Sequence, residues 1–291
     1  MTRSSCLASM LLAAWAAAAL AAPVTVVDDR GHRVTLAQPP QRVVSLSPSL
    51  SETVCALQAC GRIVGTDRYS NWPASLRGVP KLGGLDDTQI ERLAALKPDL
   101  VLAAVSTRAV ERLEALGLPV LALEPRNRAD TRRTIVTVAQ ALGEPAAAPA
   151  LLAQLDARIA AAAASVPARL RGKSVYFEVA STPFAAGESS FVGELLAGLG
   201  LVNIVPAALG PFPQLNPEFV LRAQPALVMA SVDELAQMPG RPGWGALRAL
   251  QNKQTCGFAS EPFDALMRAG PRLGDAAQAI ADCLRALENP P

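Results

Sequence analysis

The chain is organised around the segment Ile90-Glu91-Arg92-Leu93-Ala94-Ala95-Leu96-Lys97-Pro98-Asp99-Leu100-Val101-Leu102-Ala103-Ala104. Its glutamate opens a short amphipathic helix, its proline ends that helix, and the apolar run that follows predicts a buried strand. The same order returns in Pro217-Glu218-Phe219-Val220-Leu221-Arg222-Ala223-Gln224-Pro225-Ala226-Leu227-Val228-Met229-Ala230-Ser231. A helix-to-strand unit that recurs at this distance indicates two similar lobes rather than one lobe with an insertion.

Short apolar runs and amphipathic helices alternate through the rest of the chain, after a hairpin pattern over Val24–Val27 and Arg33–Leu36. Such alternation predicts parallel sheets with helices on both faces. The length of the chain suits two domains better than one. The predicted fold class is therefore α/β, with two doubly wound lobes.

Between the two repeat units lies an alanine-rich segment, Pro145–Val166, whose apolar stripe at helical spacing is made by Leu151, Leu152, Leu155 and Ile159. Alanine has the highest helix propensity, so the segment predicts one long continuous helix. Its place in the chain suggests a single backbone helix that connects the lobes; the alternative is an ordinary surface helix of the first lobe. The predicted division is a signal peptide over 1–21, an N-terminal lobe over 22–143, the connecting helix over 144–170 and a C-terminal lobe over 171–291.

The first residues predict export. Arg3 gives a short positive start, Leu7–Leu20 is a compact apolar run, and Ala19-Leu20-Ala21 predicts a cleavage site, so the mature chain is expected to begin near Ala22. The apolar run is short for a membrane span, and an N-terminal anchor is the alternative. We therefore expect a periplasmic protein.

Composition excludes several classes of partner. The 27 basic and 25 acidic residues nearly cancel, so the sequence offers no basic field for nucleic acid and no polybasic segment for a membrane surface. With 51% apolar residues, each lobe has enough material for a core.

Four cysteines remain after the predicted cleavage site, and an even number in an exported protein suggests disulfides with three possible pairings. We favour Cys256 with Cys283, on a strand and a helix of one lobe, and Cys55 with Cys60. The second pair requires the helix before it to end near Ala59, and free buried thiols are the alternative. No metal site is predicted, because the sequence has one histidine and no Cys-x-x-Cys.

Aromatic residues fall on predicted strand-exit loops in both halves: Tyr69 and Trp72 in the first, and Phe184, Phe212 and Phe263 in the second. Carboxyl ends of parallel strands line the ligand crevice in doubly wound sheets. Each aromatic alone is more often a core or loop anchor, but their shared placement favours one apolar binding cleft between the lobes.

Three acidic residues have both a structural and a functional interpretation. Asp264 and Arg268 share one face if their segment is helical, either as a surface ion pair or as a pair that orients a ligand. Glu91 and Glu218 complement a helix N-terminus or present matched charges to one partner. The sequence contains no Gly-x-Ser-x-Gly, phosphate loop or metal-ligand cluster, so no catalytic residues are predicted.

Three segments resemble the iron-siderophore/vitamin B12 class of periplasmic binding proteins: Arg42-Val43-Val44-Ser45-Leu46-Ser47-Pro48, Ile90 to Val101, and Phe212-Pro213-Gln214-Leu215-Asn216-Pro217-Glu218. The similarity covers nearly the whole predicted mature chain. It implies a class III architecture, in which one backbone helix bridges two α/β lobes. It also implies that cobalamin is held between the lobes as transported ligand, not as cofactor, and delivered to an ABC importer.

The resemblance also assigns roles to single residues. It implies that Glu91 and Glu218 dock to arginines of the membrane permease, and that ligand contacts come from Tyr69, Phe184, Phe212, Asp264 and Arg268. Positions that carry tryptophan in vitamin B12 binders hold Leu85, Ala104 and Phe212 here. In the family, the second-lobe disulfide joins two positions, of which one matches Cys283 and the other falls near Ala197 here. Because Ala197 cannot form a disulfide, Cys256 is the substitute partner for Cys283. We expect a monomer with little relative motion of its lobes on binding.

Three other functions are compatible with the sequence. A receptor for haem or a ferric siderophore would use Tyr69 as axial ligand, or Arg68 and Arg268 as anion partners. An exported cleft enzyme would place a nucleophile or acid/base pair at the same loops and depend on Asp264. A structural adaptor would leave the cleft empty.

Overall fold

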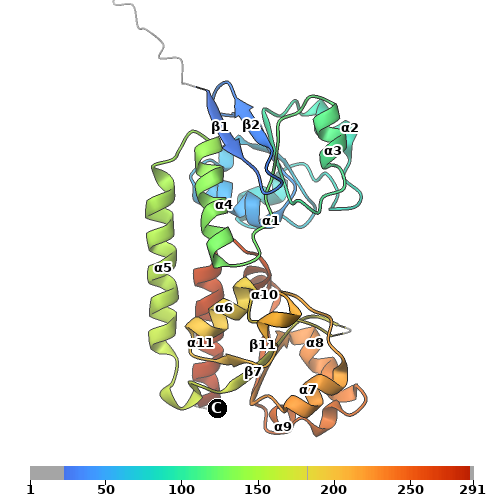
Figure 1. Cartoon of the computed structure of the whole chain (residues 1–291), viewed down its shortest axis with the longest axis vertical. Helices are drawn as coiled ribbons and strands as arrows, with labels where there is room; N and C mark the ends of the chain where they lie inside the picture. The colour runs from blue at the N-terminus through green and yellow to red at the C-terminus, as the bar shows by residue number, and fades with distance from the viewer. Residues whose placement is uncertain (1–22, 182, 289–291) are drawn as a thin grey trace, which may run out of the picture.

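The computed structural model describes residues 23–181 and 183–288, which form two α/β halves beside one long helix (Figure 1). The predicted signal peptide lies outside the described residues. Among the helices of the described ranges, none combines the length and the apolar character that a bilayer crossing requires.

The first half is built on a four-stranded parallel sheet of order β4-β3-β5-β6. Its strands are β3 (Val43–Ser45), β4 (Ile63–Thr66), β5 (Leu100–Ala103) and β6 (Val120–Ala122). Its helices are α1 (Pro48–Ala56), α2 (Ile90–Ala95), α3 (Val110–Ala115) and α4 (Arg128–Ala141). A separate antiparallel hairpin, β1 (Val24–Val27) with β2 (Arg33–Leu36), packs beside α4.

Successive residues of these strands face opposite layers. Leu100 and Leu102 of β5 pack into the core that includes α1 and α4, whereas Val101 and Ala103 pack into the core that includes α2 and α3. All four residues are fully buried, because helices cover both faces of the sheet. This is why the strand appears in the sequence as a continuous apolar run rather than an alternating one.

The second half repeats this plan around a five-stranded sheet of order β11-β10-β7-β8, with β9 also on β7. Its strands are β7 (Ser174–Ala180), β8 (Phe184–Ala185), β9 (Val202–Asn203), β10 (Leu227–Ser231) and β11 (Thr255–Phe258). Its helices are α6 (Phe191–Gly198), α7 (Pro217–Ala223), α8 (Val232–Gln237), α9 (Arg248–Gln251), α10 (Ser260–Met267) and α11 (Leu273–Glu288). All its pairings are parallel except that of β8.

The two predicted repeat units are α2 followed by β5 and α7 followed by β10. Each helix carries its glutamate in the first turn. The residue before each proline adopts a left-handed backbone, with φ of 46° at Lys97 and 43° at Gln224. The same uncommon conformation at equivalent points supports the duplication that the sequence indicated.

One unbroken helix, α5 (Ala147–Ser165), lies beside α4 of the first half and α11 of the second (Figure 1). Its buried residues are Ala148, Leu152, Leu155, Ile159 and Ala162, which recur at helical spacing. Ion pairs tie its polar edge to both neighbours, since Asp156 lies 2.7 Å from Arg132 of α4 and Arg158 lies 2.5 Å from Asp275 of α11. One hydrophobic core therefore runs from the first sheet through α5 to the second.

Two local details of the helices follow from single residues. Near the end of the second half, a 3-10 turn over Trp244–Ala246 and the short α9 are separated by the extended Leu247. Helix α4 begins at Arg128, where the Asn127 side chain accepts a hydrogen bond from the Asp130 N–H at 2.8 Å.

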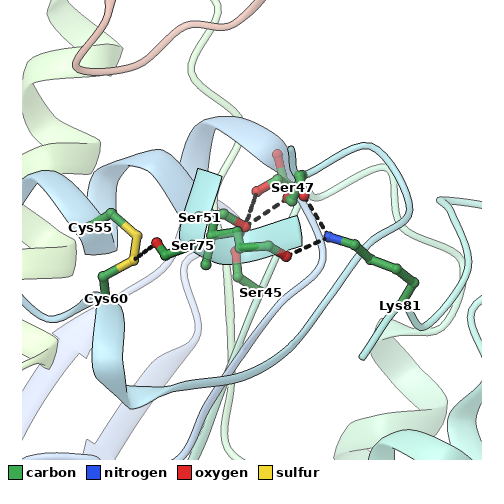
Figure 2. The surroundings of a disulfide bond; sticks show 9 residues. Ser45, Ser47, Ser51, Cys55, Cys60, Ser75 and Lys81 are labelled. Atoms are coloured by element: carbon green, nitrogen blue, oxygen red, sulfur yellow. Dashed lines mark hydrogen bonds between the residues drawn. A yellow bond between two sulfur atoms is a disulfide. The ribbon is translucent and has the colours of Figure 1, made fainter. Parts of the chain in front are cut away.

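Both favoured disulfides are present. Cys256 of β11 bonds Cys283 of α11, with their Cα atoms 5.8 Å apart. Cys55, near the end of α1, bonds Cys60, whose sulfur lies 3.6 Å from the Ser75 hydroxyl (Figure 2). The helix ends before Cys60, as this pairing requires: α1 ends at Ala56, and Gln58 with φ of 62° reverses the chain.

The two disulfides are expected to contribute unequally to stability. In the loop-closure model a longer loop loses more entropy in the unfolded chain, so removing Cys256–Cys283 should cost about 3–4 kcal/mol and removing Cys55–Cys60 about 2 kcal/mol. Urea denaturation of the two double-alanine variants against the parent chain measures this. A larger loss for the Cys55/Cys60 variant would contradict the loop-length explanation.

Candidate ligand-binding cleft

A cavity of about 430 Å³ opens between the two halves at the carboxyl ends of their strands. From the first half it is lined by residues that follow all four strands of the sheet: Ser47–Ser49 after β3, Tyr69 after β4, Ala104 after β5 and Leu123–Pro125 after β6. From the second half come Phe191, Phe212, Asp264 and Met267–Ala269. Its volume lies within the range of about 300–1,000 Å³ that small-molecule sites occupy.

Aromatic side chains face this cavity from both halves. Tyr69 is 61% exposed and Phe212 is 37% exposed, although both are large apolar rings. Phe212 meets Phe191 edge-on, with ring centroids 5.6 Å apart, and the Phe191 N–H donates to the Arg126 carbonyl across the halves at 3.0 Å. Exposed aromatic faces at the rim of a cavity are surfaces that an apolar ligand would cover.

The loop that carries Tyr69 is held by a buried carboxylate. Asp67 accepts a hydrogen bond from the Tyr69 N–H at 2.8 Å and another from the Ser70 hydroxyl. Burial raises the pKa of Asp67, and these two donors oppose the shift. Ser70 in turn bonds the Ser51 hydroxyl of α1 at 2.8 Å. The Tyr69 backbone is therefore fixed before any ligand arrives.

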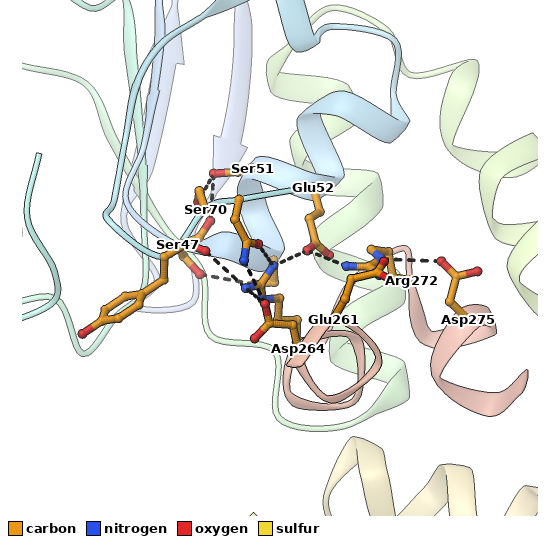
Figure 3. Close-up of polar contacts among 12 residues, drawn as sticks. Ser47, Ser51, Glu52, Ser70, Glu261, Asp264, Arg272 and Asp275 are labelled. Atoms are coloured by element: carbon orange, nitrogen blue, oxygen red, sulfur yellow. Dashed lines mark hydrogen bonds and ion pairs between the residues drawn. The ribbon is translucent and has the colours of Figure 1, made fainter. Parts of the chain in front are cut away.

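Beneath the cavity, a buried ion-pair network joins the halves (Figure 3). We call it the latch: Glu52 of α1, with Arg268 and Arg272 from the α10–α11 junction. Glu52 is fully buried; Arg268 is 2.7 Å and Arg272 3.5 Å from its Oε1 atom. Burial raises the pKa of Glu52, while hydrogen bonding and charge from the arginines oppose that shift.

The guanidinium of Arg268 is largely occupied by hydrogen bonds and ion pairs within the protein. Besides Glu52, it donates to Asn71 Oδ1 at 2.9 Å and to the Tyr69 carbonyl at 3.2 Å, and it pairs with Asp264 at 2.8 Å. Asp264 also accepts from the Asn71 amide at 3.0 Å. Asp264 of α10 and Arg268, which directly follows that helix, thus form a pair and line the cavity, but Arg268 chiefly holds the two halves together.

Other residues proposed as ligand contacts lie beside the cavity or away from it. Phe184 is exposed on β8 and bridges to Gln214, next to the Phe212 loop. Leu85 is exposed in the loop whose Gly83 carbonyl accepts the Arg68 N–H at 2.7 Å. Neither is among the lining residues.

Trp72 lies in a different place from the one proposed. It lines a separate cavity of about 220 Å³ beside α5, where the Arg272 guanidinium sits 4.6 Å from its ring centroid. The side chain of its neighbour Asn71 accepts a hydrogen bond from Arg268 on the cleft side. Trp72 therefore lies on the other side of the loop. Trp72 therefore supports the latch rather than the cleft.

Sequence reasoning did not single out Phe191, Met267, Ser47 or Glu124 as cavity residues. Ser47 and Glu124 each come directly after a predicted strand, so the rule that ligands meet carboxyl ends of strands would have found them. Phe191 and Met267 belong to helix ends, and nothing in the local pattern marks them.

The two glutamates of the repeat units lie on the surface. The side chains of Glu91 and Glu218 are 82% and 71% exposed and pair loosely with Arg112 at 3.6 Å and Arg222 at 3.5 Å. In Figure 1 their helices, α2 and α7, both lie on the side of the molecule away from α5. Exposed pairs of this kind contribute little to stability, so both carboxylates remain available to a partner.

Comparison with known proteins agrees with this architecture. The family model described as periplasmic binding protein matches residues 43–260. The chain belongs to the periplasmic binding protein family. An uncharacterised ABC transporter substrate-binding lipoprotein of Bacillus subtilis is 26% identical over 90% of this chain and 85% of its own length.

A cobalamin-binding protein of Halobacterium salinarum is 32% identical over 72% of this chain, although the match spans only 59% of that protein. The solved structure of the haem-binding protein RhuT from Roseiflexus sp. RS-1 superposes with a TM-score of 0.73 at 25% identity, over 84% of this chain and 97% of that one. The fold is that of class III periplasmic binding proteins. Family members bind small molecules for transport rather than as cofactors, and family membership implies an exported protein with an ABC permease as partner.

Removing one side of the latch should destabilise the protein strongly. Arg268→Met leaves the buried Glu52 with only the more distant Arg272, and we expect the free energy of unfolding to fall by about 3 kcal/mol. Adding Glu52→Gln removes the uncompensated charge and should recover about 1 kcal/mol or more. Urea denaturation of the single and double variants measures both.

The matched control is Arg77→Met, an exposed arginine of the first half, which should change stability by less than about 0.5 kcal/mol. If Arg268→Met were no more destabilising than Arg77→Met, the latch would not hold the halves together.

Proposed function

We propose that this protein captures cobalamin or a related corrinoid in the cleft between its lobes and delivers it, as a periplasmic monomer, to the permease of an ABC importer. The observation that carries the proposal is the character of the cleft. Aromatic faces approach from both lobes, while Arg268, the one cation among the described lining residues, is committed to internal partners.

A corrinoid fits these surfaces by its chemistry. It has broad apolar faces and a fringe of amides, and it carries little net charge. Tyr69 and Phe212 would cover the apolar faces, and the serine hydroxyls and carboxylates of the rim would meet the amides. The Halobacterium relative named as a cobalamin-binding protein supports the same ligand class.

A haem receptor is the second candidate, favoured by the phenol of Tyr69 in the cleft and by the similarity to the Roseiflexus haem-binding protein. Haem needs an axial ligand, which Tyr69 could provide, and cationic partners for its propionates. Arg268 is occupied, and Arg68 pairs with Asp87. An anionic siderophore would likewise find no free cation among the described residues that line the cavity.

A catalytic role has little support. The hydroxyls of Ser47 and Ser49, which line the cavity, lie 3.2 Å from each other. Lys81, a candidate base in the same half, donates to Thr66 Oγ1, the Ser70 carbonyl and the Leu76 carbonyl at 2.9, 2.5 and 3.0 Å. All three of its protons are therefore used, and we infer a binding protein rather than an enzyme.

Titration of the purified mature chain with cyanocobalamin should give one site of micromolar or tighter affinity. Tyr69→Ala and Phe212→Ala should each weaken binding about 10- to 100-fold, because each removes a buried aromatic contact of about 1.5–3 kcal/mol. Leu116→Ala, at an exposed apolar position of the first lobe outside the cavity, is the control and should bind as the parent does.

The visible spectrum of protein purified from its native host distinguishes the two ligands, because corrinoids and haem absorb at different wavelengths. A haem Soret band that disappears in Tyr69→Ala, together with no cyanocobalamin binding at 100 μM (about −5.5 kcal/mol), would replace the corrinoid proposal with the haem receptor.

Reversal of both docking glutamates should abolish transport and leave ligand affinity unchanged. In Glu91→Arg/Glu218→Arg, each lobe presents a cation to the permease arginines that we propose as partners, and like charges repel. Uptake of labelled ligand by cells that carry the cognate permease measures transport, and equilibrium titration measures affinity.

The control is Glu111→Arg/Asp233→Arg, which reverses one exposed first-turn carboxylate in each lobe, on α3 and α8. Normal uptake with the control and none with the first variant is the expected result. Uptake that survives reversal of Glu91 and Glu218 would reduce them to charges that complement helix ends.

A further inference from the structure

We propose that Glu124 selects the ligand: its free carboxylate oxygen accepts a hydrogen bond from a primary amide of the bound corrinoid and rejects ligands that present a carboxylate there. The inference deepens the proposed function and rests on it. It adds a residue to the site that neither the repeat pattern nor the aromatic placement indicated.

The backbone of Glu124 is fixed at the carboxyl end of β6. The Leu123 N–H donates to the Ala103 carbonyl at 2.9 Å, which extends the sheet by one residue. The Glu124 N–H donates to Asp29 Oδ2 at 2.7 Å, and Asp29 is held by Arg133 at 2.9 Å. The position of the side chain is therefore set by the sheet and the hairpin, not by a mobile loop.

The side chain is oriented through one of its two oxygens. Ser106, in the loop after β5, donates to Glu124 Oε2 from its N–H at 3.1 Å and from its hydroxyl at 3.2 Å. Within residues 23–181 and 183–288, no hydrogen bond reaches Oε1. A carboxylate that is anchored by one oxygen and lines a cavity presents a directed acceptor to whatever enters.

The electrostatics around Glu124 favour a hydrogen-bond donor. Asp264 lines the same cavity from the second lobe, so carboxylates stand on both walls. Arg268 pairs with Glu52 and Asp264, and among the described residues no ion pair reaches Glu124. An amide N–H of the ligand would gain a charge-assisted bond with Glu124, whereas a ligand carboxylate placed against the Oε1 atom would face a like charge.

Glu124 also lines a second hollow of about 520 Å³ toward the hairpin, whose other charged residues are Asp28, Asp29, Asp130, Arg126 and Arg133. A ligand that fills the aromatic part of the cleft and extends toward this hollow must pass Glu124.

The experiment compares cyanocobalamin with the set of its monocarboxylic acids, in each of which one peripheral propionamide is hydrolysed. The parent chain should bind at least one acid about 10- to 100-fold more weakly than cyanocobalamin, as loss of a charge-assisted hydrogen bond implies. Glu124→Gln should weaken cyanocobalamin about 3- to 10-fold and reduce the discrimination against that acid to about threefold or less.

Two controls keep the result specific. Glu124→Gln retains an acceptor for Ser106, so its melting temperature should match the parent's. Glu111→Gln removes an exposed carboxylate of α3 outside the cavity and should leave all the affinities unchanged.

The possible outcomes separate the two proposals. Cyanocobalamin binding with the same discrimination in Glu124→Gln as in the parent would overturn the role of Glu124 while leaving the corrinoid function intact. A parent chain that binds neither cyanocobalamin nor any of the acids would overturn the corrinoid function, and the inference with it.

Discussion

The contact between Glu52 and the two arginines of the α10–α11 junction sets the geometry on which the cleft depends. Ionised groups are expensive to remove from water, and Glu52 is fully buried, so its position is acceptable only while the arginines are in place. Arg268 reaches across to the Tyr69 carbonyl and to Asn71 as well. The same side chain therefore fixes the distance between the lobes and the loop that carries an aromatic wall.

This arrangement holds the two walls of the cleft at a defined separation. The latch ties the lobes together below the cavity, and α5 ties them along one side through a shared hydrophobic core. A buried charge pair and a continuous core both resist the shear that a wide hinge motion would require. Preorganisation of this kind lowers the free energy spent on ordering the site, so a modest set of contacts can still give tight binding.

Secondary structure and duplication could be predicted from the sequence because both depend on short-range patterns. Leu100–Ala103 is recognisable as a strand from its apolar run, and α5 from its alanines and its stripe. The latch could not be predicted in this way, because Glu52 and Arg268 are 216 residues apart and only their fold brings them together. Asp264 and Arg268, four residues apart, were the visible part of that network.

The placement of Tyr69 and Trp72 shows a second limit of local reasoning. Both lie in one loop after β4, and the sequence treats them alike. Asn71, between them, is held on the cleft side by Arg268 and Asp264, so Trp72 turns toward Arg272 and α5 while Tyr69 faces the cavity. Which aromatic of a loop meets the ligand is thus decided by a residue from the other lobe.

A fixed separation of the lobes also constrains how a permease would sense occupancy. Helices α2 and α7 belong to different lobes, so the spacing of Glu91 and Glu218 is set by the latch and by α5 rather than by the ligand. A permease that docks on both glutamates would then recognise the loaded and the empty receptor with nearly the same spacing. The signal of occupancy would have to come from the cleft itself, which is lined by Tyr69, Phe212 and Glu124. If the two glutamates dock to the permease as we propose, discrimination between loaded and empty receptors would belong to the rim of the cleft, and the glutamates would contribute only to affinity and orientation.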